Sequence, residues 1–328
     1  MRVGIDSFTI RELNLNPYEM IDYLKERNFE GIQFGCVRAL SATLDIAELK
    51  KIKAYADAKD MYIHVGVSPV NPVICDGGIC ALEAVIKPEI EAAAAVGWHE
   101  LHSLIETNML RYEHAVPWKR HVDGCIELIN RLRPVLEKNG SRINIETHGE
   151  TTFDILRVIN ATGPHLTGVC LDTANTFVNA EDPVLATKRV APYTHLTHTK
   201  DAIVCFCEEG LLRQGKPPGM GNVRFDKILP VLAEYSPDLP LSIEDHKWLF
   251  KARIFEPDWI ELNPDLTPYE LGQTVKYAWE TQQKLFNGDI PPIDEYEKTA
   301  YIEELEERIS FGRDYLNRLL KELNLQNI

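Results

Sequence analysis

Short apolar runs alternate with amphipathic segments along most of the chain. The runs are five to seven residues long, as buried strands usually are, and they lie at residues 3–8, 31–35, 62–67, 100–105, 142–148, 167–173, 193–199 and 239–245. The segments between them carry apolar residues at spacings of three and four, which predicts helices with one buried face. These helices are expected at residues 17–27, 45–58, 81–96, 118–138, 152–160, 183–190, 225–235 and 268–286.

Strict alternation of strands and helices predicts an α/β fold in which helices cover a parallel sheet. Eight strand–helix units favour a closed (β/α)8 TIM barrel over residues 1–290. The alternative is an open, doubly wound sheet, which usually has a glycine-rich turn after its first strand. That turn reads Asp6-Ser7-Phe8-Thr9 here and contains no GxGxxG motif, so the barrel is favoured.

A charged segment follows the eighth unit. It begins after Pro291-Pro292 and predicts a helix from about Glu295 to Leu323. Its apolar side chains fall roughly on one stripe: Ile302, Leu305, Ile309, Tyr315, Leu316 and Leu319. We therefore expect a C-terminal helical extension, residues 291–328, packed on the barrel or on a partner, with bracing of the barrel favoured.

The composition excludes several classes of protein. The 328 residues are 45% hydrophobic and 26% charged, which is typical of a globular chain and not of a disordered one. The net charge of −15 disfavours binding to nucleic acid or to an anionic membrane. The sequence has no apolar run of ~18 residues that could span a bilayer and no secretion signal at its start. Seven irregularly spaced cysteines are then expected to be reduced, in the cytoplasm.

Four strand ends carry candidate metal ligands. Glu146, Asp172, His198 and Glu244 follow the apolar runs of the fifth to eighth predicted strands. Active sites of such barrels lie at the carboxyl ends of the strands, and neighbouring strands are ~4.8 Å apart. The four side chains can therefore converge on one ion.

The donor types indicate a divalent metal ion. Three carboxylates without a cation would repel one another and become protonated, and a divalent ion relieves that repulsion. Three carboxylates and one imidazole suit Mn²⁺, Mg²⁺ or Co²⁺, or Zn²⁺ with fewer ligands. We favour Mn²⁺, because an oxygen-rich site with open positions leaves room for two substrate oxygens.

Three further histidines are candidate site residues. His148 has the same strand parity as Glu146, so it is expected over the metal as a proton acceptor, with a hydrogen bond to a loop as the alternative. His64 and His102 lie on the third and fourth predicted strands and are candidate substrate contacts. A histidine satisfied within the core is the alternative for both.

Lys200 and Asp201 directly follow His198 and are also candidate substrate-binding residues. Lys200 has the parity of His198 and is expected to stabilise negative charge on a substrate oxygen. The alternative is a salt bridge at the rim, which contributes little.

The segment after Asp201 offers weaker signals. Residues 215–221 form a glycine-rich stretch whose backbone amides could hold an anion, although the P-loop ending GK[ST] is absent. Cys205 and Cys207 form a CxC pair that suggests a soft-metal site, but spare thiols are favoured because no second pair flanks them.

Several segments resemble the sugar-phosphate isomerase/epimerase superfamily, the xylose-isomerase-like TIM barrels. The resemblance covers roughly residues 1–290 and is carried by INIETH, LTGVCLDTAN, HLTHTKD, GMGNVRFDKIL and LPLSIED. It implies that the metal ligands are Glu146, Asp172, His198 and Glu244, in agreement with the placement of the strand ends.

At two positions the sequence departs from the pattern of one group within this superfamily. Ketohexose 3-epimerases of the superfamily have a histidine three residues after the Asp172 position and an arginine six residues after the His198 position. Asn175 and Val204 stand there in this chain, which argues against a plain ketohexose epimerase. Asn175 remains a candidate substrate-binding residue.

The H-x-K-D run is shared with inosose dehydratase-like and 3-keto-sugar-processing members. In length, in the Glu-x-His of the fifth strand and in its extended C-terminus, the chain also resembles the catalytic α subunits of bacterial C-glycoside deglycosidases. That resemblance implies a small β subunit and a 3-oxo-glucosyl flavonoid substrate. A homo-oligomer is the alternative assembly.

The expected reaction is common to these members. The metal binds the carbonyl and a neighbouring hydroxyl of a keto sugar or 3-oxo-glycoside and stabilises the enolate formed when a base removes the adjacent proton. His148 is the preferred base, with Glu146 or Glu244 second. The enolate can then epimerise, isomerise or eliminate a substituent.

Two other functions remain open from the sequence. A metal-dependent phosphodiester endonuclease of the same superfamily would need more histidine ligands, one of them at Asn175, and the net charge opposes DNA binding. A non-catalytic scaffold subunit would use the charged C-terminal helix as its interaction surface.

Overall fold

The computed structural model describes residues 1–105, 110–113 and 115–326. In these ranges, eight parallel strands close into a barrel of order β1-β10-β7-β6-β5-β4-β3-β2. They are β1 (Arg2–Asp6), β2 (Gly31–Phe34), β3 (Tyr62–Gly66), β4 (Glu100–Ser103), β5 (Arg142–Glu146), β6 (Thr167–Asp172), β7 (Thr194–Thr199) and β10 (Pro240–Ile243). The predicted (β/α)8 barrel is confirmed.

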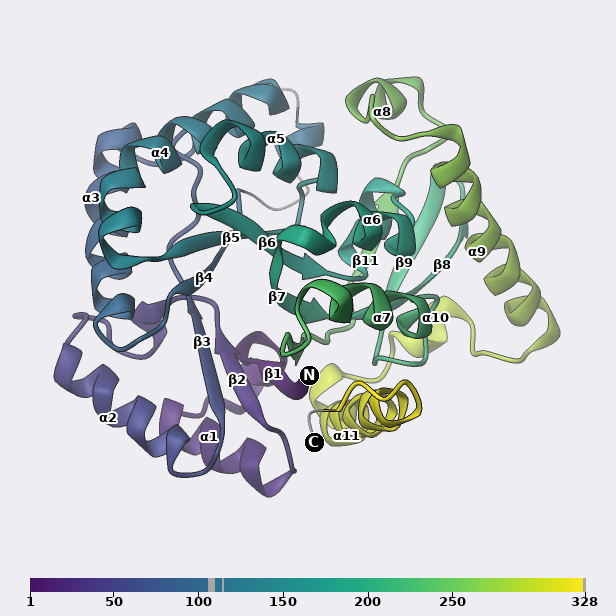
Figure 1. Ribbon diagram of the computed structural model, residues 1–328. Coiled ribbons are helices and arrows are strands. Elements are labelled where there is room, and N and C mark those ends of the chain that lie inside the picture. The colour runs from purple at the N-terminus through teal and green to yellow at the C-terminus, as the bar shows by residue number, and fades with distance from the viewer. Residues whose placement is uncertain (106–109, 114, 327–328) are drawn as a thin grey trace.

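Helices surround the barrel (Figure 1). They are α1 (Pro17–Glu26), α2 (Ile46–Asp57), α3 (Gly78–Ala94), α4 (Trp118–Asn139), α5 (Thr152–Thr162), α6 (Pro183–Val190) and α7 (Phe225–Tyr235). Short 3-10 helices are η1 (Ser7–Leu13), η2 (Val37–Ala39), η3 (Leu110–Tyr112), η4 (Asn175–Asn179) and η5 (Ala191–Tyr193). Among the described residues, no helix combines the length and apolar character needed to cross a membrane.

Local sequence explains where these helices begin. The side chain of Asn16 accepts hydrogen bonds from the first-turn amides of α1, and the Glu19 carboxylate accepts one from the Asn16 amide. Pro17 occupies the first helical position. Thr151 and Asp154 form the same reciprocal cap on α5. Each cap satisfies amides that would otherwise have no partner, so the preceding loop is held in place.

A second sheet differs from the sequence expectation. β8 (Asp201–Cys207) and β9 (Gly210–Lys216) form an antiparallel hairpin, and β11 (Leu249–Ala252) pairs with β9. α8 (Pro257–Leu262) follows this sheet, and α9 (Pro268–Asn287), the eighth predicted helix, packs on β8 (Figure 1). None of the strands predicted from the sequence covers β8, β9 or β11.

The hairpin corrects two expectations for this region. Gly215 lies within β9, and its amide bonds to the carbonyl of Trp248. The amides of Gly219 and Gly221 donate to the side chain of Asp201, so they are not available to hold an anion. Cys205 and Cys207 lie on a strand, not in a loop.

The C-terminal segment contains α10 (Ile293–Tyr296) and α11 (Tyr301–Glu322). α11 packs beside β1 and β10, close to the N-terminus in Figure 1. Leu305, Ile309, Leu316 and Leu319 of the predicted stripe are buried. Ile302 is 39% exposed, so its place on the stripe was wrong.

Candidate metal centre

The structure brings the four predicted ligands together. Glu146, Asp172 and His198 lie on β5, β6 and β7, and Glu244 directly follows β10. Their ligand atoms lie within 4.8 Å of one another, and the side chains belong to residues that are 0–6% exposed. We call these four residues the candidate centre.

Strand register explains this convergence. Asp172 is level with His198, and His198 is level with Ser242, two residues before Glu244. Glu146 is level with Cys170, two residues before Asp172. Since side chains two residues apart share a face of a strand, all four ligands project to the same side of the barrel wall.

Three buried ligand atoms face charged neighbours within the centre. Glu146 Oε1 lies 3.1 Å from His198 Nδ1, His198 Nδ1 lies 2.6 Å from Glu244 Oε2, and Asp172 Oδ2 lies 2.9 Å from Lys200 Nζ. The other oxygen of two carboxylates is anchored: Glu146 Oε2 lies 2.8 Å from His102 Nε2, and Asp172 Oδ1 accepts from two backbone amides. Three carboxylates and one imidazole crowded in this way fit a divalent cation, which relieves the repulsion between the carboxylates.

The charged side chains of the centre shift one another's pKa values. Burial alone would raise the pKa of Glu146 and of Glu244, but neighbouring positive groups, His198 for both and Lys200 for Glu244, hold both values well below the usual range. Burial raises the pKa of Asp172, and Lys200 only partly offsets this effect. The two glutamates are therefore anionic ligands and weak bases.

Gln33 on β2 fixes the orientation of His198. Its side-chain nitrogen lies 2.7 Å from His198 Nε2, while Gln33 Oε1 is buried without a partner. Turning the amide over lets Oε1 accept the Nε2 proton and satisfies both groups. His198 Nδ1 then carries no proton and can accept an ion, and it lies 3.1 Å from Glu146 Oε1 and 2.6 Å from Glu244 Oε2.

Replacing Gln33 with leucine is expected to weaken Mn²⁺ binding by about 10–100-fold, because partners that orient a metal ligand contribute that much. Competition calorimetry with a chelator would measure the affinity. Gln33→Glu keeps the acceptor and should retain more affinity than the leucine variant. An unchanged affinity in Gln33→Leu would show that the amide does not orient His198.

Lys200 lies inside the candidate centre. Its Nζ is 2.9 Å from Asp172 Oδ2 and 2.8 Å from Glu244 Oε1, and the residue is 2% exposed. Burial lowers its pKa, but the two carboxylates outweigh this effect and raise it overall. The alternative of a weak salt bridge at the rim is therefore wrong.

The other predicted histidines have different positions. His148 follows β5, is partly buried, and has a buried Nδ1 without a partner among the described residues. His102 pairs with Glu146. His64 packs on Tyr62 and lines a pocket of about 490 Å³ together with residues at the amino ends of β3 and β4. This position gives no support for its predicted contact with substrate.

Asn175 and Asp201 have structural contacts. The backbone amide of Asn175 donates to Asp172 Oδ1. The Asp201 carboxylate accepts from the amides of Ala202, Gly219, Gly221 and Val223. Both Asp201 oxygens are occupied in this way, so the carboxylate holds the loop before α7, and its contact with substrate stays a prediction.

Asp201→Asn is expected to destabilise the fold by about 1–3 kcal/mol for each amide left without an acceptor, with Mn²⁺ affinity unchanged. The side-chain NH₂ group would face amides that the carboxylate now accepts. Urea unfolding measures the loss, and Asp226→Asn, which alters a surface pair with Arg224, is the matched control. Lost affinity at full stability would instead place Asp201 in the candidate centre.

Sequence reasoning missed two residues near the centre. His246 Nε2 lies 3.6 Å from Glu244 Oε1, and the shared parity of these residues was a usable signal. Arg213 on β9 is 1% exposed, and none of its three side-chain nitrogens has a hydrogen-bond partner among the described residues. The position of Arg213 depends on the β8–β9 hairpin, which the sequence pattern did not predict.

A pocket of about 360 Å³ lies at the carboxyl ends of β1 and β2. Asp6, Phe8, Arg11 and Phe34 are among its lining residues. Asp6 also lies 3.5 Å from His198 Nε2, so this pocket adjoins the candidate centre. A small molecule bound there would be close to the ligands.

Fold and site together define a (β/α)8 barrel with a candidate divalent metal centre at the carboxyl ends of its strands. The sequence profile of the xylose isomerase-like TIM barrel matches residues 21–260, so the chain belongs to that family. No curated protein matches the sequence.

Solved structures share the fold at low sequence identity. L-ribulose 3-epimerase is 15% identical, with 98% of this chain and 95% of that chain covered and a TM-score of 0.60. The IOLI protein with a bound zinc atom is also 15% identical, with coverages of 86% and 96% and a TM-score of 0.58. The 3-keto-D-glucoside 4-epimerase of E. coli is 13% identical, with coverages of 84% and 99% and a TM-score of 0.57.

Proposed function

We propose that the chain is a divalent-metal-dependent enzyme that removes the proton next to the carbonyl of a keto sugar or 3-oxo-glycoside. The observation that carries this proposal is the convergence of three carboxylates and one imidazole in one buried cluster, with their ligand atoms within 4.8 Å of one another. Two proteins of the same fold are named as sugar epimerases, and a third holds zinc. This supports sugar isomerase or epimerase chemistry.

Glu146, Asp172, His198 and Glu244 would hold the ion, and the oxygen-rich set favours Mn²⁺. When bound, the ion supplies a Lewis acid that polarises the substrate carbonyl. The remaining work falls to side chains around the centre.

His148 is the favoured base. Glu146 has one oxygen bonded to His102 and the other facing the centre, and both oxygens of Glu244 have partners in Lys200 and His198. Glu244 therefore has no oxygen free to take a proton, and the second oxygen of Glu146 would hold the ion. His148 follows Glu146 by two residues at the carboxyl end of β5, and its buried Nδ1 has no hydrogen-bond partner among the described residues.

Two cationic side chains would stabilise the oxygen that gains charge as the C–H bond breaks. Lys200 is held between Asp172 and Glu244, and Arg213 offers N–H groups that have no partner among the described residues. Preorganised donors of this kind stabilise an enolate without reorganising. His148 then returns the proton to the opposite face for epimerisation or to the neighbouring carbon for isomerisation, or a β-substituent leaves.

The sugar epimerases of this fold favour proton return over elimination. Cleavage of a 3-oxo-C-glycoside, with a small β subunit, remains a prediction from the sequence resemblance. The endonuclease alternative has no further support, since the chain carries a net charge of −15 and Asn175 where that reaction needs a histidine. The scaffold alternative would be favoured by a purified protein that binds no divalent ion.

Incubation of the Mn²⁺-loaded protein with ketohexoses and 3-oxo-glycosides in D₂O tests the proposal. We expect deuterium at the carbon next to the carbonyl, detected by NMR, and no incorporation after removal of the ion with EDTA. Asp172→Asn, which lowers the charge of the ligand set, should label slowly under the same conditions. Turnover without label, or label independent of the ion, would contradict the proposed reaction.

A further inference from the structure

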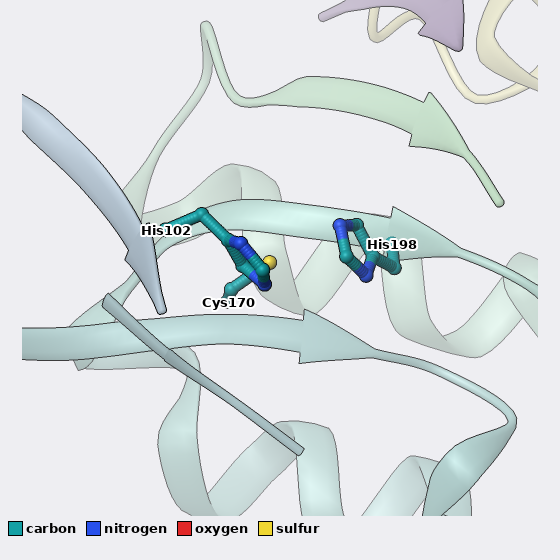
Figure 2. A group of neighbouring side chains, drawn as sticks. All are labelled: His102, Cys170 and His198. Carbon is teal, nitrogen blue, oxygen red and sulfur yellow. The ribbon is translucent and has the colours of Figure 1, made fainter. Parts of the chain in front are cut away.

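A second cluster of ligand-type side chains shares His198 with the candidate centre. His102 on β4, Cys170 on β6 and His198 on β7 offer atoms that lie within 4.8 Å of one another. All three residues are buried, at 5%, 0% and 3% exposure. Figure 2 shows these three side chains, which come from β4, β6 and β7, with β5 lying between β4 and β6. We call these residues the thiol cluster.

Strand register explains the position of the Cys170 thiol. Cys170 precedes Asp172 by two residues and is level with Glu146, so its sulfur projects to the same side of the wall as those ligands. The rings of His102 and His198 are 5.0 Å apart. Gln33 Nε2 is 3.9 Å from the sulfur, beyond a strong hydrogen bond.

One ring nitrogen in the thiol cluster lacks a partner. His102 Nδ1 is buried without a hydrogen-bond partner among the described residues. Two imidazoles and one thiol form a donor set typical of Zn²⁺, which binds Cys and His and tolerates an open fourth position. The candidate centre, by contrast, is mostly carboxylate.

We propose that His102, Cys170 and His198 form a second coordination set that binds a thiophilic divalent ion such as Zn²⁺ through a thiolate. The Cys170 S–H bond breaks, the sulfur electron pair forms the metal–sulfur bond, and the proton is released to solvent. Mn²⁺, which prefers oxygen, would select the candidate centre, whereas a thiophilic ion would select the thiol cluster.

Because His198 belongs to both sets, the two ions compete for it. We therefore expect Zn²⁺ to displace Mn²⁺ from the protein. The thiolate set does not depend on the proposed reaction, and its test needs no substrate.

Cd²⁺ is the probe, because a cadmium–thiolate bond gives an ultraviolet charge-transfer band. The wild-type protein, kept reduced, should show this band and release a proton as Cd²⁺ is added. Cys170→Ser should lose the band and bind Cd²⁺ at least about tenfold more weakly, with Mn²⁺ affinity changed less than about twofold. Cys170→Ala serves as a second variant, and circular dichroism confirms that each one folds.

Two further variants identify the source of the band. Cys205→Ser/Cys207→Ser removes the CxC pair on β8 and should leave the band unchanged. Glu244→Gln weakens the candidate centre and should also retain the band. Cd²⁺ that displaces Mn²⁺ without a band would show binding by the carboxylates alone and would overturn the thiol cluster while the candidate centre stands. A band that persists in Cys170→Ser would overturn it equally.

Discussion

Replacement of His148 with alanine is expected to lower turnover by about 10²–10⁴-fold while Mn²⁺ binding is unchanged. The reason is that His148 Nδ1 has no hydrogen-bond partner among the described residues. By contrast, Glu244 pairs with Lys200 and His198, and Glu146 pairs with His102 and would hold the ion through its other oxygen. The rate of deuterium incorporation from D₂O measures proton removal, and calorimetry measures Mn²⁺ affinity.

His64→Ala is the matched control. It makes the same change at a histidine that packs on Tyr62 and lines the pocket at the amino ends of β3 and β4, and it should leave both quantities near wild type. A wild-type rate in His148→Ala would exclude it as the base. Lost Mn²⁺ affinity in that variant would instead make His148 part of the ion's surroundings.

The barrel could be predicted because each strand is a short apolar run followed by an amphipathic helix. The β8–β9 hairpin has no such signature. Ile203 and Val204 are neighbours on opposite faces of β8, and both are buried, at 5% and 1% exposure. Burial on both faces removes the alternation that identifies a half-exposed strand. Only Lys200 separates β7 from β8, so no glycine or proline marks the start of a second strand.

The convergence of the four candidate ligands could be predicted because each one ends a strand, and register carries parity from strand to strand. Parity also explains the position of Asp201. This residue is an odd number of residues from His198, so its side chain faces away from the centre and accepts hydrogen bonds from loop amides. Arg213 could not be found, because its place near Asp172 and Glu244 depends on how the hairpin packs.

The C-terminal helix contacts the loop that carries a candidate ligand. Arg308 on α11 forms two hydrogen bonds to Asp245, Nε to Oδ2 at 2.6 Å and Nη2 to Oδ1 at 2.7 Å. Both residues are buried, at 4% and 1% exposure. Since Asp245 is bonded in sequence to Glu244, this ion pair links the extension to the candidate centre.

Arg308→Met is therefore expected to lower the free energy of unfolding by about 3–5 kcal/mol, because Asp245 would remain as a buried charge without its main partner. Urea unfolding measures the loss. Arg318→Met on the same helix is the matched control, since its pair with Glu322 is exposed and contributes about 0–1 kcal/mol.

Adding Asp245→Asn to Arg308→Met separates the buried charge from the lost packing. If the unpaired carboxylate causes the loss, the double variant should recover a large part of the stability, because no charge is then left without a partner. If it recovers nothing, the arginine stabilises α11 through contacts of its aliphatic chain. Mn²⁺ affinity in the double variant then reports whether Glu244 needs the ion pair for its position: an affinity near wild type would mean that β10 alone holds this ligand.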